Sequence, residues 1–375
     1  MSSYFKKYII FLLLLKLLTG CALQKTRQGK QFIDGKIKNP LKLVSKPNIK
    51  GKLVNQKDFS DQIIEIKRAA PLLYKKNYKV FKAVNKWLKD GAHIVDIPYF
   101  GFKIYQMAGT DNFGNVQFTS YYTPVTHARY TRQGKFQYPF YRMPYHKSQK
   151  HHLPNRAEIY AGILENHNLV LGYSNSLLDN FIMEIQGSGY VDYGDGRPLT
   201  FLRYAGENGY AYRSIGKIMT DLGYILPERI SMKTIRKWAD RHNADEVRAL
   251  LEHNPSFIFF NPQMYPVVKG ASGVPLIANS ALACDRSLIP EGSTLLVELP
   301  LLNDRGNFMN HYEIRLMAAL DVGGAIKGQH CDIYQGIGGK AGQKAGFYNH
   351  YGRVWLLKMP EKTICKLITG SPKKN

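Results

Sequence analysis

The sequence predicts a mainly β protein in which a second, β-rich domain with a few short helices is inserted into the first. The chain has 375 residues and a hydrophobic fraction of 44%, which is enough for a folded core in each of two domains. Strand patterns run from Asn115 to Asp195, helical patterns follow from Arg213 to His253, and strand patterns return from Pro262. This change from strands to helices and back predicts an insertion with boundaries near Pro124 and Asn261.

Residues 1–20 have the parts of a secretory signal peptide. Two lysines, Lys6 and Lys7, precede an apolar run from Tyr8 to Leu18, which is too short to span a membrane. The run leads into Leu-Thr-Gly-Cys, which resembles the bacterial lipobox, so we expect cleavage before Cys21 and lipidation of its thiol. An uncleaved short anchor helix is the alternative.

Residues 21–57 are expected to form a basic tether. Between Ala22 and Ser60, ten Lys or Arg residues stand against two acids, Asp34 and Asp58. A run of like charge generally stays solvated and extended. Attraction to anionic lipid or to cell wall is compatible with this stretch but is not needed to explain it.

Two helices are expected after the tether, packed against the β domain and carrying no chemistry. Ser60 is a capping residue at the start of the first helix, which Pro71 interrupts. In the second helix, from Tyr78 to Lys89, apolar residues recur at helical spacing and Gly91 ends the pattern. Trp87 in this helix is expected in the core.

The formal net charge is +24, from 52 Lys and Arg against 28 Asp and Glu. Such a charge suits three partners: nucleic acid, an anionic membrane surface, or an acidic polymer. Nucleic acid would be the default partner in the cytoplasm, so the export signal argues against it.

The stretch from Val125 to Ala157 contains no acid, seven Lys or Arg residues and six aromatic residues. Cations interleaved with aromatic rings suit a single-stranded nucleic acid groove, and they equally suit a carbohydrate strand that carries carboxylates. An exposed loop with a tyrosine-rich inner face is the alternative. The histidines nearby have no fixed cysteine or carboxylate partner, so no metal site is expected; they are His127, His146, His151 and His152.

The remaining elements of the inserted region follow from turn and capping residues. Ala157 to Asp195 is expected to form strands, with turns at 166–168 and 193–196. Three helices are expected after it, at Arg213–Leu222, Ser231–Arg241 and Asn243–His253. Asn243 and Glu246 have the spacing of a capping box.

Two carboxylates stand out near the C-terminus. The apolar run from Leu316 to Leu320 ends at Asp321, and Asp332 follows in the triplet His-Cys-Asp. Glycines crowd residues 336–346, which predicts tight turns or close approach of a ligand to the main chain. Taken alone, the two aspartates could be the acid and base of a glycosidase, or they could cap turns in a tightly turned β-barrel.

Many blocks of the chain, in one order, resemble the membrane-bound lytic murein transglycosylase A family. They are DVGGAIKGQHCDIYQGIG and AGFYNHYGRVW near the C-terminus, with FTSYYTP, FQYPFYRMP, LPNRAEIYAG, IQGSGYVDYGDG, YAGENGYAYRSIGK and NPSFIFF before them. The resemblance implies a double-psi β-barrel catalytic domain made of residues 58–124 and 262–368. It also implies that residues 125–261 form the other wall of a substrate groove.

The resemblance implies a lytic transglycosylase, which cleaves the β-1,4 bond between N-acetylmuramic acid and N-acetylglucosamine in peptidoglycan and leaves 1,6-anhydro ends. The catalytic acid is carried over to Asp332, and Asp321 is carried over as a helper that orients or tunes it. As an acid near neutral pH, Asp332 needs a raised pKa, which a nearby Lys327 would oppose. No cofactor and no metal are expected.

The resemblance also implies partners and a location. Substrate-binding residues are carried over to Thr119, Tyr121, Gln186, Ser188, Gly189, Tyr334 and Tyr348. The expected partners are peptidoglycan glycan strands, the outer membrane of a Gram-negative bacterium through lipidated Cys21 facing the periplasm, and other cell-wall enzymes, but not nucleic acid. The main alternative is a non-catalytic, expansin-like wall-loosening or wall-binding lipoprotein.

Three cysteines, Cys284, Cys331 and Cys365, remain after lipidation, an odd number that leaves at least one thiol without an intramolecular partner. The family usually has an aromatic residue where this chain has Cys331.

Overall fold

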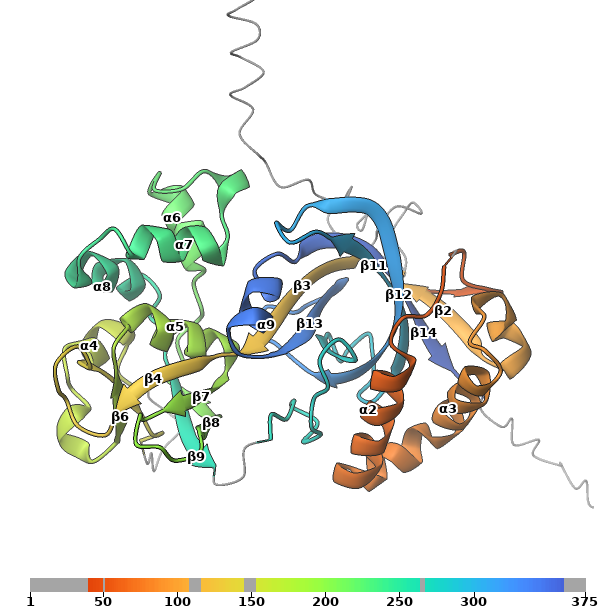
Figure 1. Ribbon diagram of the computed structural model, residues 1–375, viewed down its shortest axis with the longest axis horizontal. Coiled ribbons are helices and arrows are strands. Elements are labelled where there is room, and N and C mark those ends of the chain that lie inside the picture. The colour runs from red at the N-terminus through yellow and green to blue at the C-terminus, as the bar shows by residue number, and fades with distance from the viewer. Residues whose placement is uncertain (1–39, 50, 108–115, 145–152, 264–266, 361–375) are drawn as a thin grey trace, which may run out of the picture.

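The computed structural model describes residues 40–360 except for 50, 108–115, 145–152 and 264–266. Within these residues the chain forms two lobes, each built on its own β-sheet (Figure 1). Several predictions lie outside the described residues: the signal peptide, lipidated Cys21, the first part of the tether, residues 361–368 of the predicted barrel, and Cys365. His146, His151 and His152 also lie outside them.

The larger lobe is built on an eight-stranded sheet whose strands come from both ends of the described chain. Their order is β1-β2-β14-β11-β12-β10-β13-β3, and a further pairing of β14 with β3 closes the last six into a barrel, which β2 and β1 extend from β14. The strands are β1 (Leu41–Val44), β2 (Lys103–Met107), β3 (Val116–Thr123), β10 (Ala281–Cys284), β11 (Thr294–Leu302), β12 (Phe308–Asp321), β13 (His330–Ile337) and β14 (Asn349–Lys358). Two pairings are parallel, β10 with β12 and β13 with β3.

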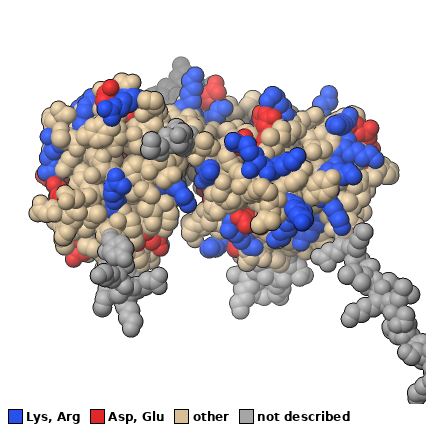
Figure 2. Space-filling model, turned by 90° about the horizontal axis from the view of Figure 1, so that it is seen from below, with Lys and Arg blue, Asp and Glu red and all other residues tan. Residues whose placement is uncertain are grey.

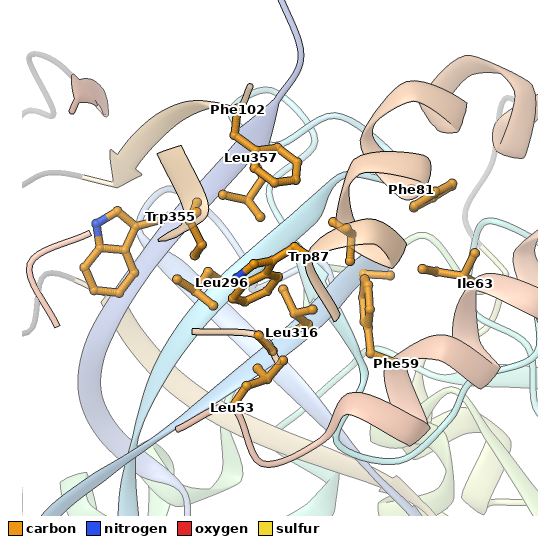
Figure 3. Packing of buried hydrophobic residues seen from close by; sticks show 14 of the residues in the cluster. Leu53, Phe59, Ile63, Phe81, Trp87, Phe102, Leu296, Leu316, Trp355 and Leu357 are labelled. Carbon is orange, nitrogen blue, oxygen red and sulfur yellow. The ribbon is translucent and has the colours of Figure 1, made fainter. Parts of the chain in front are cut away.

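Two helices, α2 (Gln56–Ala69) and α3 (Pro71–Lys89), and the 3-10 helix η1 (Ile94–Phe100) cover one side of the barrel (Figure 1). Trp87 is fully buried as predicted and packs in a cluster with Leu296 and Leu316 of the barrel (Figure 3). The first helix begins four residues before the predicted start at Ser60. The residue before it, Asn55, holds the helix to the barrel, because its side-chain amide bonds the main-chain N–H and C=O of Leu316.

The second half of the predicted tether belongs to the barrel, which corrects the prediction that residues 21–57 are solvated. β1 pairs antiparallel with β2, and Ile49 and Leu53 are buried in the same cluster as Trp87. Lys42, Lys46 and Lys52 are exposed, so the high basic content of this stretch hid a short strand and two core residues.

The smaller lobe contains a six-stranded sheet with the order β5-β6-β4-β7-β8-β9. Its strands are β4 (Val125–Arg129), β5 (Tyr138–Tyr141), β6 (Val170–Ser174), β7 (Ser188–Asp192), β8 (Thr200–Glu207) and β9 (Ile258–Gln263). Its helices are α4 (Arg156–Tyr160), α5 (Leu177–Gln186), α6 (Ile215–Asp221), α7 (Met232–Ala239) and α8 (Ala244–Glu252), with 3-10 turns η2 (Glu165–His167) and η3 (Pro227–Arg229). The predicted boundary near Pro124 lies between β3 and β4, and Asn261 lies within β9.

The helix α5 contradicts the prediction of strands throughout residues 157–195. Ser176 caps its N-terminus by accepting a hydrogen bond from the main chain of Asp179, and Gly187 ends it in the left-handed conformation. Its buried residues include the polar Asn180 and Glu184, whereas Ile185 is exposed, so the polar pattern of this segment does not follow its burial. The three later helices are confirmed, and the predicted capping box of Asn243 and Glu246 is present.

Candidate active site

Asp321 and Asp332 lie on either side of one strand. Ala283 of β10 is the register partner of Asp321 in β12 and also of Asp332 in β13. Neighbouring strands are about 4.8 Å apart, so about 10 Å separates the main chains of the two aspartates. The fold therefore brings the predicted pair to one level of the barrel.

Asp332 is partly buried and has a raised pKa. Its Oδ1 is hydrogen-bonded to the Thr119 hydroxyl at 2.7 Å, because β13 and β3 pair in parallel with these two residues in register. The pKa of Asp332 is raised to about 6, and burial is the largest cause. The hydrogen bond from Thr119 lowers this pKa, whereas the negative charge of Asp321 raises it. Lys327 is exposed and acts instead on Asp285, where it helps to lower the pKa.

Asp321 is held by three hydrogen-bond donors. The Tyr121 hydroxyl donates to Oδ2 at 2.7 Å, and the main-chain N–H groups of Ala271 and Val322 donate to Oδ1 at 2.8 and 2.9 Å. The pKa of Asp321 is raised by burial, which outweighs the lowering effect of these hydrogen bonds. Three donors on one carboxylate fit a charge that is kept in place rather than one that exchanges protons.

The loop that carries Ala271 needs a glycine next to it. A Cβ on Gly270 would lie 2.5 Å from the carbonyl oxygen of Leu320 and 3.2 Å from Cβ of Asp321. Only a residue without a side chain allows the loop to approach the end of β12 this closely. Sequence analysis missed this loop, because its contact with Asp321 spans about fifty residues.

Two of the predicted binding tyrosines lie beside the aspartates. Tyr121 and Tyr334 are register partners in β3 and β13, and their ring centroids are 5.3 Å apart. The hydroxyl of Tyr334 is hydrogen-bonded to Thr123 at 3.1 Å, and burial raises the pKa of Tyr334 to about 12. Both phenols are therefore neutral at physiological pH.

The structure places Tyr348 apart from this group. Its ring packs against the second hydrophobic cluster of the barrel, near the charges of Glu313 and Arg315. In the described part of the chain no hydrogen bond joins it to Asp321 or Asp332.

The residues predicted from the smaller lobe lie at the end of α5 and the start of β7. Oε1 of Gln186 accepts a hydrogen bond from the main-chain N–H of Tyr122 in β3 at 2.9 Å, so this side chain links the two lobes. Ser188 is partly exposed. A Cβ on Gly189 would lie 2.7 Å from the Sδ of Met183, so packing against α5 requires this glycine.

The glycine-dense run after Asp332 forms a helix rather than a series of turns. It is α9 (Gly338–Ala345), which buries Ala341 and Ala345. A Cβ on Gly342 would lie 2.7 Å from the ring of Tyr122, so this glycine serves close packing of the helix on β3.

Two arginines between Val125 and Ala157 contact aromatic rings of the smaller lobe, one within this stretch and one outside it. The guanidinium of Arg129 lies 4.4 Å from the ring centroid of Phe136, and that of Arg132 lies 5.0 Å from that of Tyr173. Basic side chains predominate over acidic ones on the face of the molecule shown in Figure 2. Among the residues that the structure describes, no cluster of His, Cys, Asp and Glu could hold a metal ion, and no helix has the length and apolar character to cross a membrane.

Two protein-family models match the chain: the MltA specific insert domain over residues 117–261 and the 3D domain over residues 280–358. Over 358 residues the chain is 54% identical to Membrane-bound lytic murein transglycosylase A of Escherichia coli K12, which covers 96% of this chain and 97% of that relative. This chain belongs to the lytic murein transglycosylase A family.

Other members and solved structures agree with this assignment. A homolog from Buchnera aphidicola is 47% identical over 353 residues, covering 94% of this chain and 96% of the relative. The crystal structure of Escherichia coli MltA with bound chitohexaose matches with a TM-score of 0.82 at 55% identity, covering 89% of this chain and 98% of that one. The predicted family and the predicted fold class, a double-psi β-barrel with an inserted β-rich domain, are confirmed.

His330 is a site residue that sequence analysis of this family member missed. Its Nε2 lies 2.8 Å from the Thr119 hydroxyl, which also contacts Asp332. Residues two apart on a strand share a face, so the His-x-Asp spacing could have placed His330 beside the acid. Between them, Cys331 is buried opposite Cys284, and both thiols are free.

Proposed function

We propose that this chain, a peptidoglycan lytic transglycosylase, uses Asp332 as the only catalytic acid and base. The observation that carries the proposal is the contrast between the two aspartates. Asp332 has one hydrogen-bond partner and a pKa of about 6, whereas Asp321 receives three hydrogen bonds. A carboxyl group that titrates near neutral pH can both give and take a proton at the working pH.

The reaction needs two proton transfers at Asp332. Its carboxyl group protonates the oxygen of the β-1,4 bridge as the bond to C1 of the muramic acid residue breaks. The resulting carboxylate then removes the proton of the C6 hydroxyl of the same sugar, and that oxygen bonds to C1. A 1,6-anhydro ring forms, the proton returns to Asp332, and no water is consumed. Ring closure within one sugar supplies the effective concentration that an external nucleophile would lack.

The arrangement of Asp321 favours this route over two-carboxylate hydrolysis. A base that activates water needs a free lone pair directed at the water, but three of the roughly four acceptor positions of Asp321 are occupied. Its negative charge instead raises the pKa of Asp332. We assign Asp321 as the helper that keeps Asp332 protonated before the reaction.

Glycan strands are the proposed ligand of the surface around Asp332. A solved relative contains chitohexaose, a chain of amino sugars. Tyr121 and Tyr334 offer neutral rings beside the acid, which suits stacking on sugars. Thr119, Gln186, Ser188 and Gly189 remain proposed as binding residues from the two lobes, and the position of Tyr348 makes it the weakest member of the set.

The proposed location is the periplasmic face of the outer membrane. Membrane association follows the relatives, which are named membrane-bound. The finer placement rests on the signal-like N-terminus, on the lipobox before Cys21, and on Ala22 in place of an aspartate. We also propose residues 58–124 and 262–368, together with β1 and the buried Ile49 and Leu53, as the catalytic domain, and residues 125–261 as the insert. Contacts with other cell-wall enzymes remain a prediction.

Analysis of the products in 18O-labelled water tests the reaction and the role of Asp332 together. Wild-type protein should release 1,6-anhydro-muropeptides without 18O from purified sacculi, and Asp332→Asn should release none while still binding chitohexaose. Incorporation of 18O at the anomeric carbon would indicate hydrolysis. An absence of products from wild-type protein would favour the expansin-like, non-catalytic alternative.

A further inference from the structure

The Thr119 hydroxyl lies between two hydrogen-bonding partners at the candidate active site. Its oxygen is 2.7 Å from Oδ1 of Asp332 and 2.8 Å from Nε2 of His330. A hydroxyl group has one proton, so at any moment Thr119 can donate to only one of these two atoms. The imidazole of His330 and the carboxyl group of Asp332 therefore compete for the Thr119 proton.

The surroundings of His330 decide the competition. The main-chain carbonyl of Ala325 raises the pKa of His330, which is the effect of an acceptor on a ring nitrogen that carries a proton. Because Nε2 faces Thr119, that nitrogen is Nδ1. Burial lowers the pKa of His330, against the effect of the Ala325 carbonyl, so the ring is neutral near pH 7 and has one proton. Its Nε2 is then a bare acceptor directed at Thr119.

We propose that His330 is a positioning residue that takes the Thr119 hydroxyl proton and thereby keeps Asp332 in its acid form. A Thr119 hydroxyl that donates to Asp332 stabilises the carboxylate and lowers its pKa. When Thr119 donates to Nε2 of His330 instead, this stabilisation is absent and Asp332 retains its own proton for the bridge oxygen. When that proton has left, the Thr119 hydroxyl turns to the new carboxylate and loses its bond to His330. This inference rests on the proposed role of Asp332 as the acid.

The other titratable groups that face Asp332 do not provide this competition. They are Asp321 from β12, Tyr121 from β3 and Cys331 from β13. Asp321 acts by its charge, while Tyr121 donates its proton to Asp321. Among the described residues, only His330 contacts the hydroxyl group that contacts the acid.

The dependence of kcat/KM on pH for His330→Phe and for the double variant His330→Phe/Thr119→Val tests the proposal. The basic limb of the pH profile is the part in which kcat/KM falls as pH rises. In His330→Phe the Thr119 proton is free to stabilise the carboxylate of Asp332, so this limb should move to lower pH by about one unit. The rate should then fall about tenfold at pH 7 and stay near wild type below about pH 4.5. Adding Thr119→Val removes the hydroxyl that donates to Asp332, so the basic limb should return to its wild-type position.

The single variant Thr119→Val gives an independent measurement if His330→Phe does not fold. If His330 holds the hydroxyl proton, Thr119→Val leaves the basic limb within a few tenths of a unit of wild type. If Thr119 donates to Asp332 instead, removing it raises the limb by about one unit and overturns the proposal. An equal loss of rate at every pH in His330→Phe would also overturn it.

Two controls separate this proposal from the proposed function. His311→Phe, at an exposed position of β12, should leave the pH profile unchanged. If wild-type protein makes no anhydro products, the proposed function fails. If it makes them and the His330 variants do not shift the limb, only the role of His330 fails.

Discussion

Thr119 and Tyr121 lie two residues apart on β3 and bond to different aspartates. Thr119 contacts Asp332 and the Tyr121 hydroxyl donates to Asp321, because alternate residues of a strand share one face. A single strand therefore supplies a hydroxyl group to both carboxylates. Asp321 also receives hydrogen bonds from the main chain of Ala271 and Val322, and this difference between the two acids separates their proposed roles.

The rate of cleavage should depend on the protonation of Asp332. Its pKa of about 6 means that the carboxyl group is protonated below this pH and ionised above it. We expect kcat/KM to fall as pH rises through about 6, by about tenfold per unit well above it. Steady-state rates on purified glycan strands between pH 4 and pH 8 would check this. A rate that keeps rising up to pH 8 would contradict an acid at this position.

Asp332→Asn should make the folded protein more stable at neutral pH. The pKa of Asp332 is raised on folding, so its contribution to stability is favourable below about pH 4 and is lost as pH rises through about 6. Asparagine cannot ionise, so the variant should be more stable by about 1 to 3 kcal/mol at pH 7 and similar to wild type at pH 4. Thermal unfolding at the two pH values measures the difference. Equal melting temperatures at pH 7 would count against a buried, charged Asp332.

Tyr121→Phe should weaken the helper role of Asp321 without removing a ring. The variant loses the hydrogen bond to Asp321 Oδ2, so the pKa of Asp321 rises and its negative charge near Asp332 is partly lost. We expect the basic limb of kcat/KM to move to lower pH and the rate at pH 7 to fall by about three- to tenfold. In Tyr334→Phe, which loses the bond to Thr123 instead, the limb should stay in place. The same shift in both variants would argue against a specific effect through Asp321.

Gly270→Ala should disturb the loop that donates to Asp321. The added methyl group meets a main-chain oxygen at 2.5 Å, so the loop must move and Ala271 loses its hydrogen bond. We expect a loss of about 1 to 3 kcal/mol in the free energy of unfolding together with a lower rate. Gly339→Ala in α9 is the matched control, because its Cβ would meet no atom within 4 Å. It should be neutral or slightly stabilising, and similar losses in both variants would contradict the argument.

Glu184→Gln should test a buried ion pair that joins two helices of the smaller lobe. The guanidinium of Arg156 in α4 lies 2.7 Å from Glu184 in α5, with 2% and 4% of the two side chains exposed. Glutamine removes the countercharge of the buried Arg156, which keeps its bonds to Tyr160, Asn254 and Ser256, so we expect a loss of about 3 to 5 kcal/mol. Chemical denaturation would measure it. For the exposed pair of Lys57 and Asp61, Asp61→Asn should leave the free energy of unfolding nearly unchanged.

Local patterns in the sequence predicted some helices correctly and gave the wrong secondary structure for others. The helix Asn243–His253 was predictable because its capping box and apolar spacing agree. The helix α5 was not, because its polar residues Asn180 and Glu184 are buried while Ile185 is exposed. In α9, Gly342 allows close approach to the ring of Tyr122, and that partner is known only from the fold.

The candidate site was predicted in its residues but not in its hydrogen bonds. Asp321 and Asp332 were found because each ends or begins a strand pattern with glycines nearby. The pairing of both with Ala283 depends on strand register, which no local pattern contains. The donor Ala271 and the role of His330 depend on contacts between distant segments. Properties that decide which aspartate is the acid therefore appear only in the folded chain.

The contact of Thr119 with Asp332 joins residues that are 213 positions apart. The strand that carries Asp332 is followed only by α9 and β14 among the described elements. During synthesis, a growing chain therefore has neither the proposed acid nor the contact between Asp332 and Thr119 until its last strands have been added. If Asp332 is the acid, a copy cut short before β13 should be unable to break a glycan strand, because the group that does so is assembled last.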